Sequence, residues 1–391
     1  MGRTHSHRAV NDDELVVGPV PRVVLLSALG LIGVAAIIAI VLLWPEGEAA
    51  DDLRGSVGFA APGVTFPDAE VVSVQGDSIS AEVLEGEDRG TEVTVEVPPQ
   101  VAASGLDTGD RIELIRTPAG EGSDATFGYF GTNRSADLWL LAALFVAVVL
   151  WVARLRGVLA LVGLAFSAAL VWLFVLPALL TGEPAVLVAV TGSVAILYVV
   201  LYTTHGFSVR TSAALAGTLG GLAITAAIGR WAVGSAHLAG NTDEGSSVLS
   251  TFADNLSFQS LLVAAIILAG LGVLNDVTIT QASAVWELRV ASPSMPRAQL
   301  FSSAMRIGRD HIASSIYTIV FAYLGTALTL LLVIQLYDRP VLDLMGTEEI
   351  ATEVIRSLTS SIGLVLAVPL TTLIAVITVP SATRGSPGMD F

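Results

Sequence analysis

Charged side chains gather in one stretch of an otherwise apolar region, residues 275–311, which we call the polar stretch. Asp276 and Glu287 lie in its first half, and Arg306 and Arg309 lie in its second. An ionisable group near the centre of a membrane helix costs about 2.5 kcal/mol or more, so such groups persist mainly where they pair, meet water or bind something. These residue types can take up a proton or a cation, or hold an anionic group. The polar stretch is therefore the candidate functional site.

The spacing within the polar stretch predicts two polar helix faces. If a helix continues past residue 275, four polar residues recur at intervals of four, three and four and share one face. They are Asp276, Thr280, Ser283 and Glu287. After a break at residues 292–296, a second face carries Arg306, Arg309 and Asp310. We expect the two faces to meet across a hairpin, where Asp276 or Glu287 pairs with Arg306 or Arg309.

Two interpretations of that hairpin remain open. In the structural one, the ion pairs only hold a cytoplasmic hairpin against the helix bundle, and the Arg side chains contact lipid phosphates. In the functional one, Asp276 binds a proton or cation in a cavity, while Arg306 and Arg309 bind an anionic group. Glu287 and Asp310 would then orient those side chains. The charges lie near the membrane interface, where burial costs less, so the sequence does not decide between the two.

Composition sets the class of protein and excludes several functions. Of 391 residues, 53% are hydrophobic and 14% are charged, which indicates a membrane protein, since soluble domains carry about 25% charged residues. The chain has no Cys and no Lys, which excludes disulfides, thiolate sites and the phosphate-binding P-loop. A net charge of −16 argues against nucleic acid as a partner. No hydrolase motif and no dense His–carboxylate cluster occurs, so we expect no enzyme, no metal and no cofactor.

Uncharged segments predict the membrane helices. Eight segments approach or exceed the roughly 20 residues needed to cross the hydrocarbon layer. They are residues 23–44, 138–153, 157–180, 184–204, 211–229, 255–275, 312–337 and 357–383. The sequence therefore predicts a mainly α membrane protein with a first helix at 23–44 and a seven-helix bundle over 138–383. The GxxxG spacing of Gly217 and Gly221 predicts close helix packing.

Arginine distribution predicts the orientation. With the N-terminus inside, the short inner loops hold more Arg than the outer ones, as the positive-inside rule requires. Both termini, residues 1–22 and 384–391, are therefore expected in the cytoplasm.

Residues 45–137 have a different character from the rest of the chain. They contain 19 Asp or Glu and 5 Arg. Polar and apolar residues alternate over 70–74, 78–84, 92–97 and 111–115, which predicts short antiparallel strands. We expect a small extracytoplasmic all-β domain at about 55–118, an OB- or SH3-like barrel inserted after the first helix. The alternatives are a spacer or assembly module and a ligand-binding domain.

The motifs of the polar stretch resemble a known family. Asp276-Val-Thr-Ile-Thr-Gln-Ala-Ser283, followed by Gly308-Arg-Asp310, is similar to elements of the YibE/F family of bacterial multi-pass membrane proteins. Gln281 and His311 differ from that pattern, so any role for them is specific to this chain. The resemblance implies a bacterial plasma-membrane protein, usually taken for a transporter, and it supplies no substrate, cofactor or catalytic residue.

These observations lead to two functional hypotheses. The first is a transporter or permease component with a polar site at the cytoplasmic ends of the sixth and seventh helices, which binds an unidentified solute. The second is a non-transporting envelope scaffold or assembly factor that acts through the β domain. Membrane lipid is the expected surrounding in both, and a homo-oligomer or an envelope protein partner is compatible with either.

Overall fold

The computed structural model describes residues 19–45, 47, 58–119, 124–241, 244–252, 256–336 and 340–380. These residues form two compact units. The described part of 52–158 makes one unit, and the described parts of 1–51 and 159–391 make the other. Of the predicted tails, residues 1–18 and 384–391 lie outside the described residues, and residues 19–22 belong to the first helix.

Six helical segments in the described residues are long and apolar enough to cross a membrane, or seven if a bent pair, α10 (Arg297–Thr326) with α11 (Leu328–Leu336), is one span. The protein is therefore a multi-pass membrane protein by helix length and hydropathy. The six are α1 (Pro19–Leu42), a run made of α4 (Ser135–Leu170), a π-helical turn (Val171–Val175) and α5 (Leu176–Leu180), then α6 (Ala185–His205), α7 (Val209–Ser235), α9 (Phe258–Ala291) and α13 (Glu348–Thr378).

This count is lower than the eight helices predicted because two predicted segments join. Residues 138–153 and 157–180 both fall within the 46-residue run Ser135–Leu180. Arg154 departs from helical geometry, with φ 51° and ψ −129°, a conformation that is uncommon for a residue with a side chain. The run therefore consists of two helices joined at a kink, and the kink lies in the gap predicted between residues 153 and 157.

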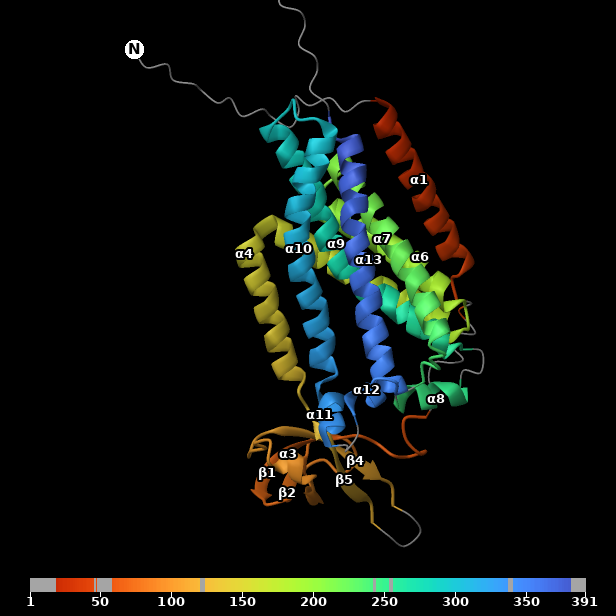
Figure 1. Cartoon of the computed structure of the whole chain (residues 1–391). Coiled ribbons are helices and arrows are strands. Elements are labelled where there is room, and N and C mark those ends of the chain that lie inside the picture. Colours follow the sequence, from red (N-terminus) through yellow and green to blue (C-terminus); the bar gives the residue numbers. More distant parts are fainter. Residues whose placement is uncertain are drawn as a thin grey trace, which may run out of the picture. The chain divides into compact units, whose positions relative to one another are not determined.

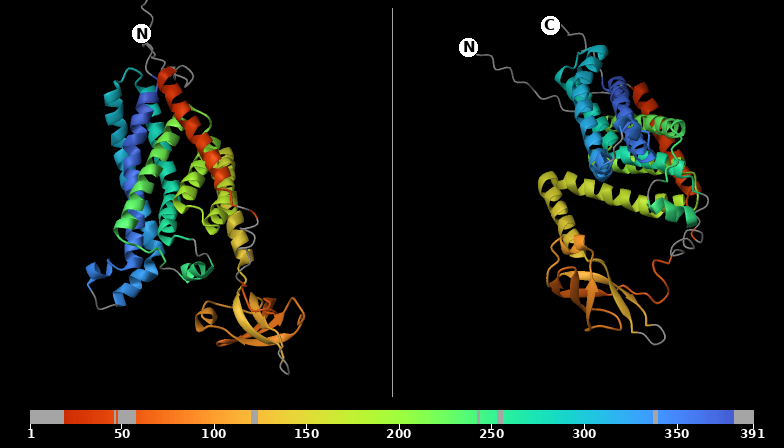
Figure 2. Two further views of the ribbon diagram at one scale, coloured as in Figure 1. Left: turned by 90° about the vertical axis from the view of Figure 1, so that its right-hand side faces the viewer. Right: turned by 60° about the horizontal axis from the view of Figure 1, so that its bottom comes forward.

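The helix bundle is built around α7, α9 and α13, which pack most extensively against one another (Figures 1 and 2). Helix α6 packs against α9, and α10 packs against α9 and α13. Helix α10 meets α11 at a bend of 62°. The start of α1, the end of α13 and the turn between α9 and α10 lie at one end of the bundle (Figure 1). Two short helices, α8 (Glu244–Phe252) and α12 (Val341–Leu344), lie at the other end.

Glycines allow α7 and α13 to approach closely, as the sequence predicted for Gly217 and Gly221. A Cβ atom added to Gly217 would lie 1.9 Å from Thr371 Oγ1, and one added to Gly221 would lie 2.8 Å from the Cβ of Ala367. On the opposite helix, a Cβ at Gly363 would lie 1.9 Å from Thr225 Oγ1. The backbones therefore come close enough for each glycine to receive the side chain of the facing helix.

The other unit contains a five-stranded antiparallel sheet that curves into a half-barrel. Its strand order is β3-β2-β1-β4-β5, and the edge strands β3 and β5 also contact each other. The strands are β1 (Asp68–Gln75), β2 (Ser78–Val83), β3 (Glu92–Glu96), β4 (Arg111–Thr117) and β5 (Thr126–Thr132). A four-residue helix, α3 (Pro99–Ala102), connects β3 to β4.

Four of these strands were predicted with each end correct to within two residues, and the fifth was not predicted. The predicted alternation is visible as burial, since Ile79, Ala81 and Val83 on β2 are buried while the residues between them are not. The fifth strand, β5, extends the β domain beyond the predicted boundary at residue 118. Gly128 and Gly131 weaken its strand signal, because glycine is depleted in strands.

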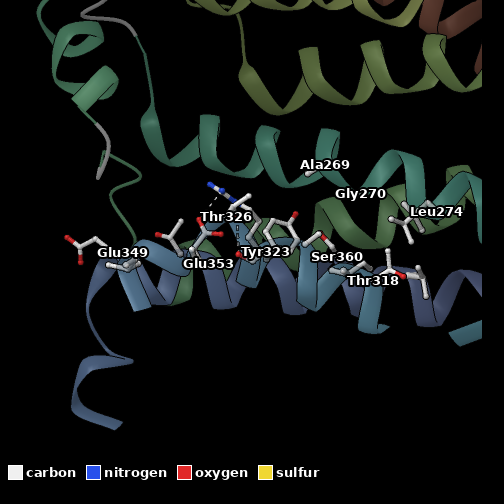
Figure 3. A pocket seen from close by; sticks show the side chains of 17 residues that line it. Ala269, Gly270, Leu274, Thr318, Tyr323, Thr326, Glu349, Glu353 and Ser360 are labelled. Atoms are coloured by element: carbon white, nitrogen blue, oxygen red, sulfur yellow. Dashed lines mark hydrogen bonds and ion pairs between the residues drawn. The ribbon is translucent and has the colours of Figure 1, made fainter. Parts of the chain in front are cut away.

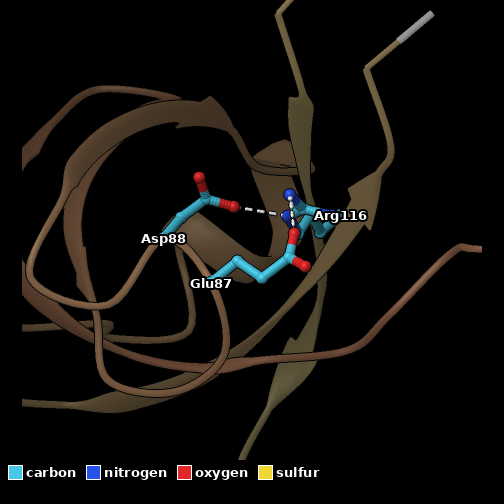
Figure 4. Close-up of polar contacts among 3 residues, drawn as sticks. All are labelled: Glu87, Asp88 and Arg116. Atoms are coloured by element: carbon cyan, nitrogen blue, oxygen red, sulfur yellow. Dashed lines mark hydrogen bonds and ion pairs between the residues drawn. The ribbon is translucent and has the colours of Figure 1, made fainter.

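An ion-pair cluster ties a loop of this domain to the sheet (Figure 4). Glu87 and Asp88 lie between β2 and β3, and both accept hydrogen bonds from Arg116 on β4. The distance from Arg116 Nη2 to Glu87 Oε2 is 3.0 Å. The hydrogen bond with Asp88 raises the pKa of the Arg116 guanidinium above its ordinary value. The cluster holds the loop against β4 by joining Asp88 to Arg116, which are 28 residues apart in the sequence.

Candidate functional site

A cavity of about 590 Å³ opens inside the helix bundle, and we call it the α13 cavity (Figure 3). Its walls come from α9, α10, α11 and the first half of α13. Ligand sites in proteins commonly measure about 300–1,000 Å³, so this cavity can hold a small organic molecule. The first turns of α13 lie at the end of the bundle opposite the start of α1 (Figure 1).

One face of α13 supplies the polar wall of the cavity. Its polar residues follow at intervals of three, one, three and four, which places them along one side of a helix. They are Glu349, Thr352, Glu353, Arg356 and Ser360. The acidic residues stand near the helix N-terminus, where the helix dipole favours negative charge. In Figure 3 this face runs from Glu349 past Glu353 and Ser360 toward Leu274.

The polar wall contains an ion pair and several buried atoms without a partner. Arg356 Nη1 donates to Glu353 Oε1 at 3.0 Å, and both side chains are about one quarter exposed. Four buried atoms of this wall form no hydrogen bond within the protein: Thr352 Oγ1, Glu353 Oε2, Arg356 Nε and Ser360 Oγ. Each such atom costs about 1–3 kcal/mol unless water or a bound molecule satisfies it.

An apolar cluster forms the floor of the cavity. Leu274, Ile319 and Leu364 line the cavity and belong to this cluster, which is completed by Val277, Ala367 and Val368. All six side chains are buried. The cavity thus has a charged end and an apolar end, and apolar side chains close it at the floor.

Beyond the floor, Gln281 joins three helices. Its Nε2 on α9 donates to the carbonyl of Ala304 on α10 at 3.0 Å and to Thr372 Oγ1 on α13 at 2.7 Å. Gly308 leaves room for this side chain, because a Cβ there would lie 2.9 Å from Gln281 Oε1. Gln281 is 1% exposed, and its Oε1 has no hydrogen-bond partner in the protein. This difference from the expected family pattern therefore has a structural consequence in this chain.

The residues predicted as a site lie elsewhere. The predicted helix continuation and hairpin are confirmed, since α9 runs to Ala291 and α10 starts at Arg297. None of the seven candidate residues lines the α13 cavity. Their side chains are exposed or, for two of them, half-buried. The exposed residues are Asp276, Glu287, Arg306, Arg309 and Asp310, and the half-buried ones are Thr280 and Ser283.

The ion pair expected between the two polar faces does not form among these described side chains. Arg306 Nη2 instead donates to Ser303 Oγ at 2.9 Å, and Thr280 Oγ1 donates to the carbonyl of Asp276 at 2.8 Å. Exposed pairs gain about 0–1 kcal/mol, too little to draw long side chains together across a hairpin. A role for these residues in binding stays a prediction.

The hairpin turn is held by a residue that sequence reasoning did not single out. Arg289 is 3% exposed, and its Nη1 donates to the carbonyls of Pro293 at 3.0 Å and Met295 at 2.7 Å. These bonds satisfy two backbone acceptors in the turn after α9. Arg289 therefore closes the turn between α9 and α10.

Arg289→Met is expected to loosen this turn while leaving both helices in place. Each lost hydrogen bond from a charged donor costs about 1.5–3 kcal/mol, because the carbonyls lose their partner. Hydrogen exchange at the amides of Ser292 and Met295, which are hydrogen-bonded in this turn, should accelerate by at least about tenfold. Arg210→Met, at an Arg near the start of α7, serves as the control. Unchanged exchange in Arg289→Met would show that the turn does not depend on these bonds.

Glu349, Glu353 and Arg356 lie before residue 357, where the sequence predicted that the last hydrophobic segment begins. Their i, i+4 and i+7 spacing was the available signal that the helix begins earlier, at Glu348. The earlier start of this helix was not predicted, because only uncharged segments were counted as membrane helices.

Comparison with known proteins identifies the chain. The sequence model of one protein family, described as YibE/F-like protein, matches residues 141–381. The chain belongs to the YibE/F-like family. The match includes the whole α13 cavity and the polar stretch, and the half-barrel sheet lies before it. Neither a curated protein nor a solved structure matches the chain.

Proposed function

We propose that this YibE/F-like protein is a membrane transporter whose solute binds in the α13 cavity. The observation that carries the proposal is the set of four buried, unpartnered polar atoms around the Glu353–Arg356 ion pair. A bundle that served only as an anchor gains nothing from leaving such atoms unpaired, because each one lowers its stability. A solute with complementary donors and acceptors would satisfy them once their covered side chains turn toward it.

In this proposal the apolar floor separates the two sides of the transport route. Transporters expose a central site alternately to either side of the membrane. Here Leu274, Ile319 and Leu364 close the cavity, and the Gln281 bridge lies beyond them. A shift of α10 relative to α9 and α13 would open the floor and break the Gln281 bonds. The exposed carboxylates and guanidinium groups of the polar stretch would then meet the solute on the far side.

The positive-inside rule supports an outward-open cavity. Arginine-rich short loops place both termini in the cytoplasm. The start of α1 and the end of α13 share one end of the bundle, as that orientation requires (Figure 1). The first turns of α13, with Glu349, would then lie at the outer face of a bacterial plasma membrane. The extracytoplasmic side is likewise proposed for the β domain.

Glu353→Gln and Arg356→Gln are expected to weaken solute binding without unfolding the protein. Each removes a charged partner worth about 1.5–3 kcal/mol, so the affinity should fall by at least about tenfold. Purified protein in lipid nanodiscs would be screened by thermal unfolding against amines, carboxylates, amino acids and sugars, because a ligand that binds the folded state raises the midpoint. Counterflow in proteoliposomes would then test transport of any compound that binds.

Two exposed residues outside the cavity give matched controls. Asp343→Asn on α12 and Arg230→Gln on α7 remove the same charges and should leave the screen unchanged. Asp276→Asn tests the polar stretch. If Asp276→Asn abolishes binding while Glu353→Gln does not, the solute site is in the polar stretch and the cavity assignment is wrong. If no compound binds and no variant changes transport, the transporter proposal fails.

A scaffold role for the β domain is the second candidate, and an aromatic cluster favours it. Phe59, Phe66 and Phe130 contact one another edge to face, with ring centroids 4.8–5.7 Å apart. Phe59 is 77% exposed, and exposed aromatic side chains are enriched in interfaces. The strand order, with β3 next to β5, also agrees with an OB-like barrel. Under this alternative, Phe59→Ser would impair function in cells, whereas Glu353→Gln would not.

A further inference from the structure

We infer that the α13 cavity takes an amphipathic organic cation, a molecule with a protonated amine at one end and an apolar body at the other. This inference rests on the proposed function and names the class of solute. It follows from the charge at the polar end, the unpartnered atoms there and the apolar floor.

The charge of the cavity favours a cation. Its ionisable lining consists of two carboxylates, on Glu349 and Glu353, and one guanidinium, on Arg356. Arg356 is already paired with Glu353, so Glu349, which is exposed at the mouth of the cavity, leaves one negative charge in excess there. An anionic solute would have to approach two carboxylates to reach one guanidinium. A cation meets attraction from the excess charge.

The unpartnered atoms match an ammonium group. Glu353 Oε2 can only accept hydrogen bonds, and the hydroxyls of Thr352 and Ser360 can accept as well. An ammonium carries three N–H donors and no acceptor, so it can serve Glu353 Oε2 and the neighbouring Thr352 hydroxyl. Ser360 lies about 10 Å further along α13 and would meet another part of the solute. Thr352 is 5% exposed and Ser360 is 4% exposed, so neither hydroxyl can rely on bulk solvent. The remaining donor, Arg356 Nε, fits a hydroxyl or carbonyl oxygen near the amine.

The size and the apolar end argue against an inorganic cation. Among the described residues, no group of three or more His, Asp or Glu side chains could hold a metal ion. The cavity is several times larger than an ion needs, and Leu274, Ile319 and Leu364 line its inner end. These side chains can cover the apolar body of a solute whose amine lies at Glu353. Burial of that body adds affinity in proportion to its area.

The test compares three probes that share one apolar chain. Hexylammonium, hexanoate and hexanol would be titrated into the purified full-length protein in lipid nanodiscs, and empty nanodiscs would correct for partition into lipid. Hexylammonium is expected to bind saturably, at least about tenfold more tightly than hexanol, because only the amine pairs with Glu353. Methylammonium should bind at least about tenfold more weakly than hexylammonium, because it lacks the apolar body.

Variants connect the binding to the cavity. Glu353→Gln is expected to weaken hexylammonium binding at least about tenfold and to leave the weak binding of hexanol unchanged. Asp343→Asn is expected to bind like the wild type. Binding of hexanoate as tight as that of hexylammonium, or hexylammonium binding that Glu353→Gln leaves intact, would overturn the inference.

The failure of this inference can be told apart from failure of the proposed function. If another compound from the screen binds in a Glu353-dependent manner and hexylammonium does not, the solute class is wrong and the cavity remains the transport site. If neither the probes nor any screened compound binds, both are wrong.

Discussion

Gly363→Ala is expected to lower the free energy of unfolding by about 2 kcal/mol or more, since overpacking in a close-packed interior costs about 1–3 kcal/mol or more. The added Cβ would lie 1.9 Å from Thr225 Oγ1. The overlap can be relieved only if Thr225 rotates and loses its hydrogen bond to the carbonyl of Gly221, or if α7 and α13 separate. The thermal midpoint of the purified protein in nanodiscs, read by size-exclusion chromatography after heating, measures the effect.

A second substitution shows whether the clash itself is the cause. Thr225→Ala removes the hydroxyl that the new Cβ of Gly363→Ala would overlap. The nearest remaining atom is the Cβ of residue 225, at 3.1 Å from the new Cβ, a distance that small shifts can accommodate. Thr225 Oγ1 bonds only to the carbonyl of Gly221 in its own helix, so Thr225→Ala alone should cost about 1 kcal/mol or less. The double variant should therefore recover most of the lost stability.

Two glycines of α7, the other helix of this pair, complete the comparison. Gly217→Ala should destabilise as strongly, and Thr371→Ala should not rescue it, because the new Cβ would still lie 2.7 Å from the Cβ of residue 371. Gly234→Ala meets no atom within 4 Å and should be neutral or stabilising, since alanine is the better helix former. Equal effects at Gly217, Gly234 and Gly363 would show that the α7–α13 approach does not limit stability.

Ser360→Cys is expected to react with a small thiol reagent far faster than a cysteine on the neighbouring residue. The chain has no Cys, so a single introduced thiol reports without background. Ser360 lines the α13 cavity, whereas Thr359 packs against Gly229 of α7, and the two side chains are 4% and 2% exposed. The labelling rate of Ser360→Cys should exceed that of Thr359→Cys by about 100-fold or more, because the second needs local opening of the bundle.

The charge of the reagent tests the electrostatics of the same cavity. A cationic trimethylammonium-ethyl methanethiosulfonate should label Ser360→Cys roughly tenfold faster than the anionic sulfonatoethyl reagent, given one excess negative charge nearby. Adding Glu353→Gln should reduce that preference. Labelling of intact cells by these impermeant reagents would place the cavity mouth on the outer side. Equal rates at positions 359 and 360 would contradict an open cavity.

Local sequence patterns were sufficient for most of the β domain. Four strands follow from alternation of apolar and polar residues, because alternate side chains of a strand face opposite sides of the sheet. The fifth strand, Thr126–Thr132, escaped because two of its seven residues are glycines. It is held by antiparallel pairing with β4, a partner that precedes it in the chain but that its own composition does not reveal.

The helix ends show the same limit. The turn at residues 292–296 was predicted from its prolines and serines, and α9 and α10 do end and begin there. The start of α13 was placed nine residues late, at 357, because Glu349, Glu353 and Arg356 were treated as loop residues. A membrane helix tolerates charged residues where they face a cavity between helices. The sequence of one segment does not reveal whether such a cavity lies beside it.

The sequence by itself determined that this is a multi-pass membrane protein, where most hydrophobic segments lie and which four stretches pair as strands, because hydropathy and residue period act within a few turns of chain. It also carried the YibE/F-like motifs. Only the tertiary structure decided which polar helix face lines the interior of the bundle. The polar stretch and the first turns of α13 have equally regular spacing, yet the first faces outward and the second lines a cavity. That difference depends on how α9, α10, α11 and α13 pack together, and helical periodicity does not specify the neighbour that a face will meet.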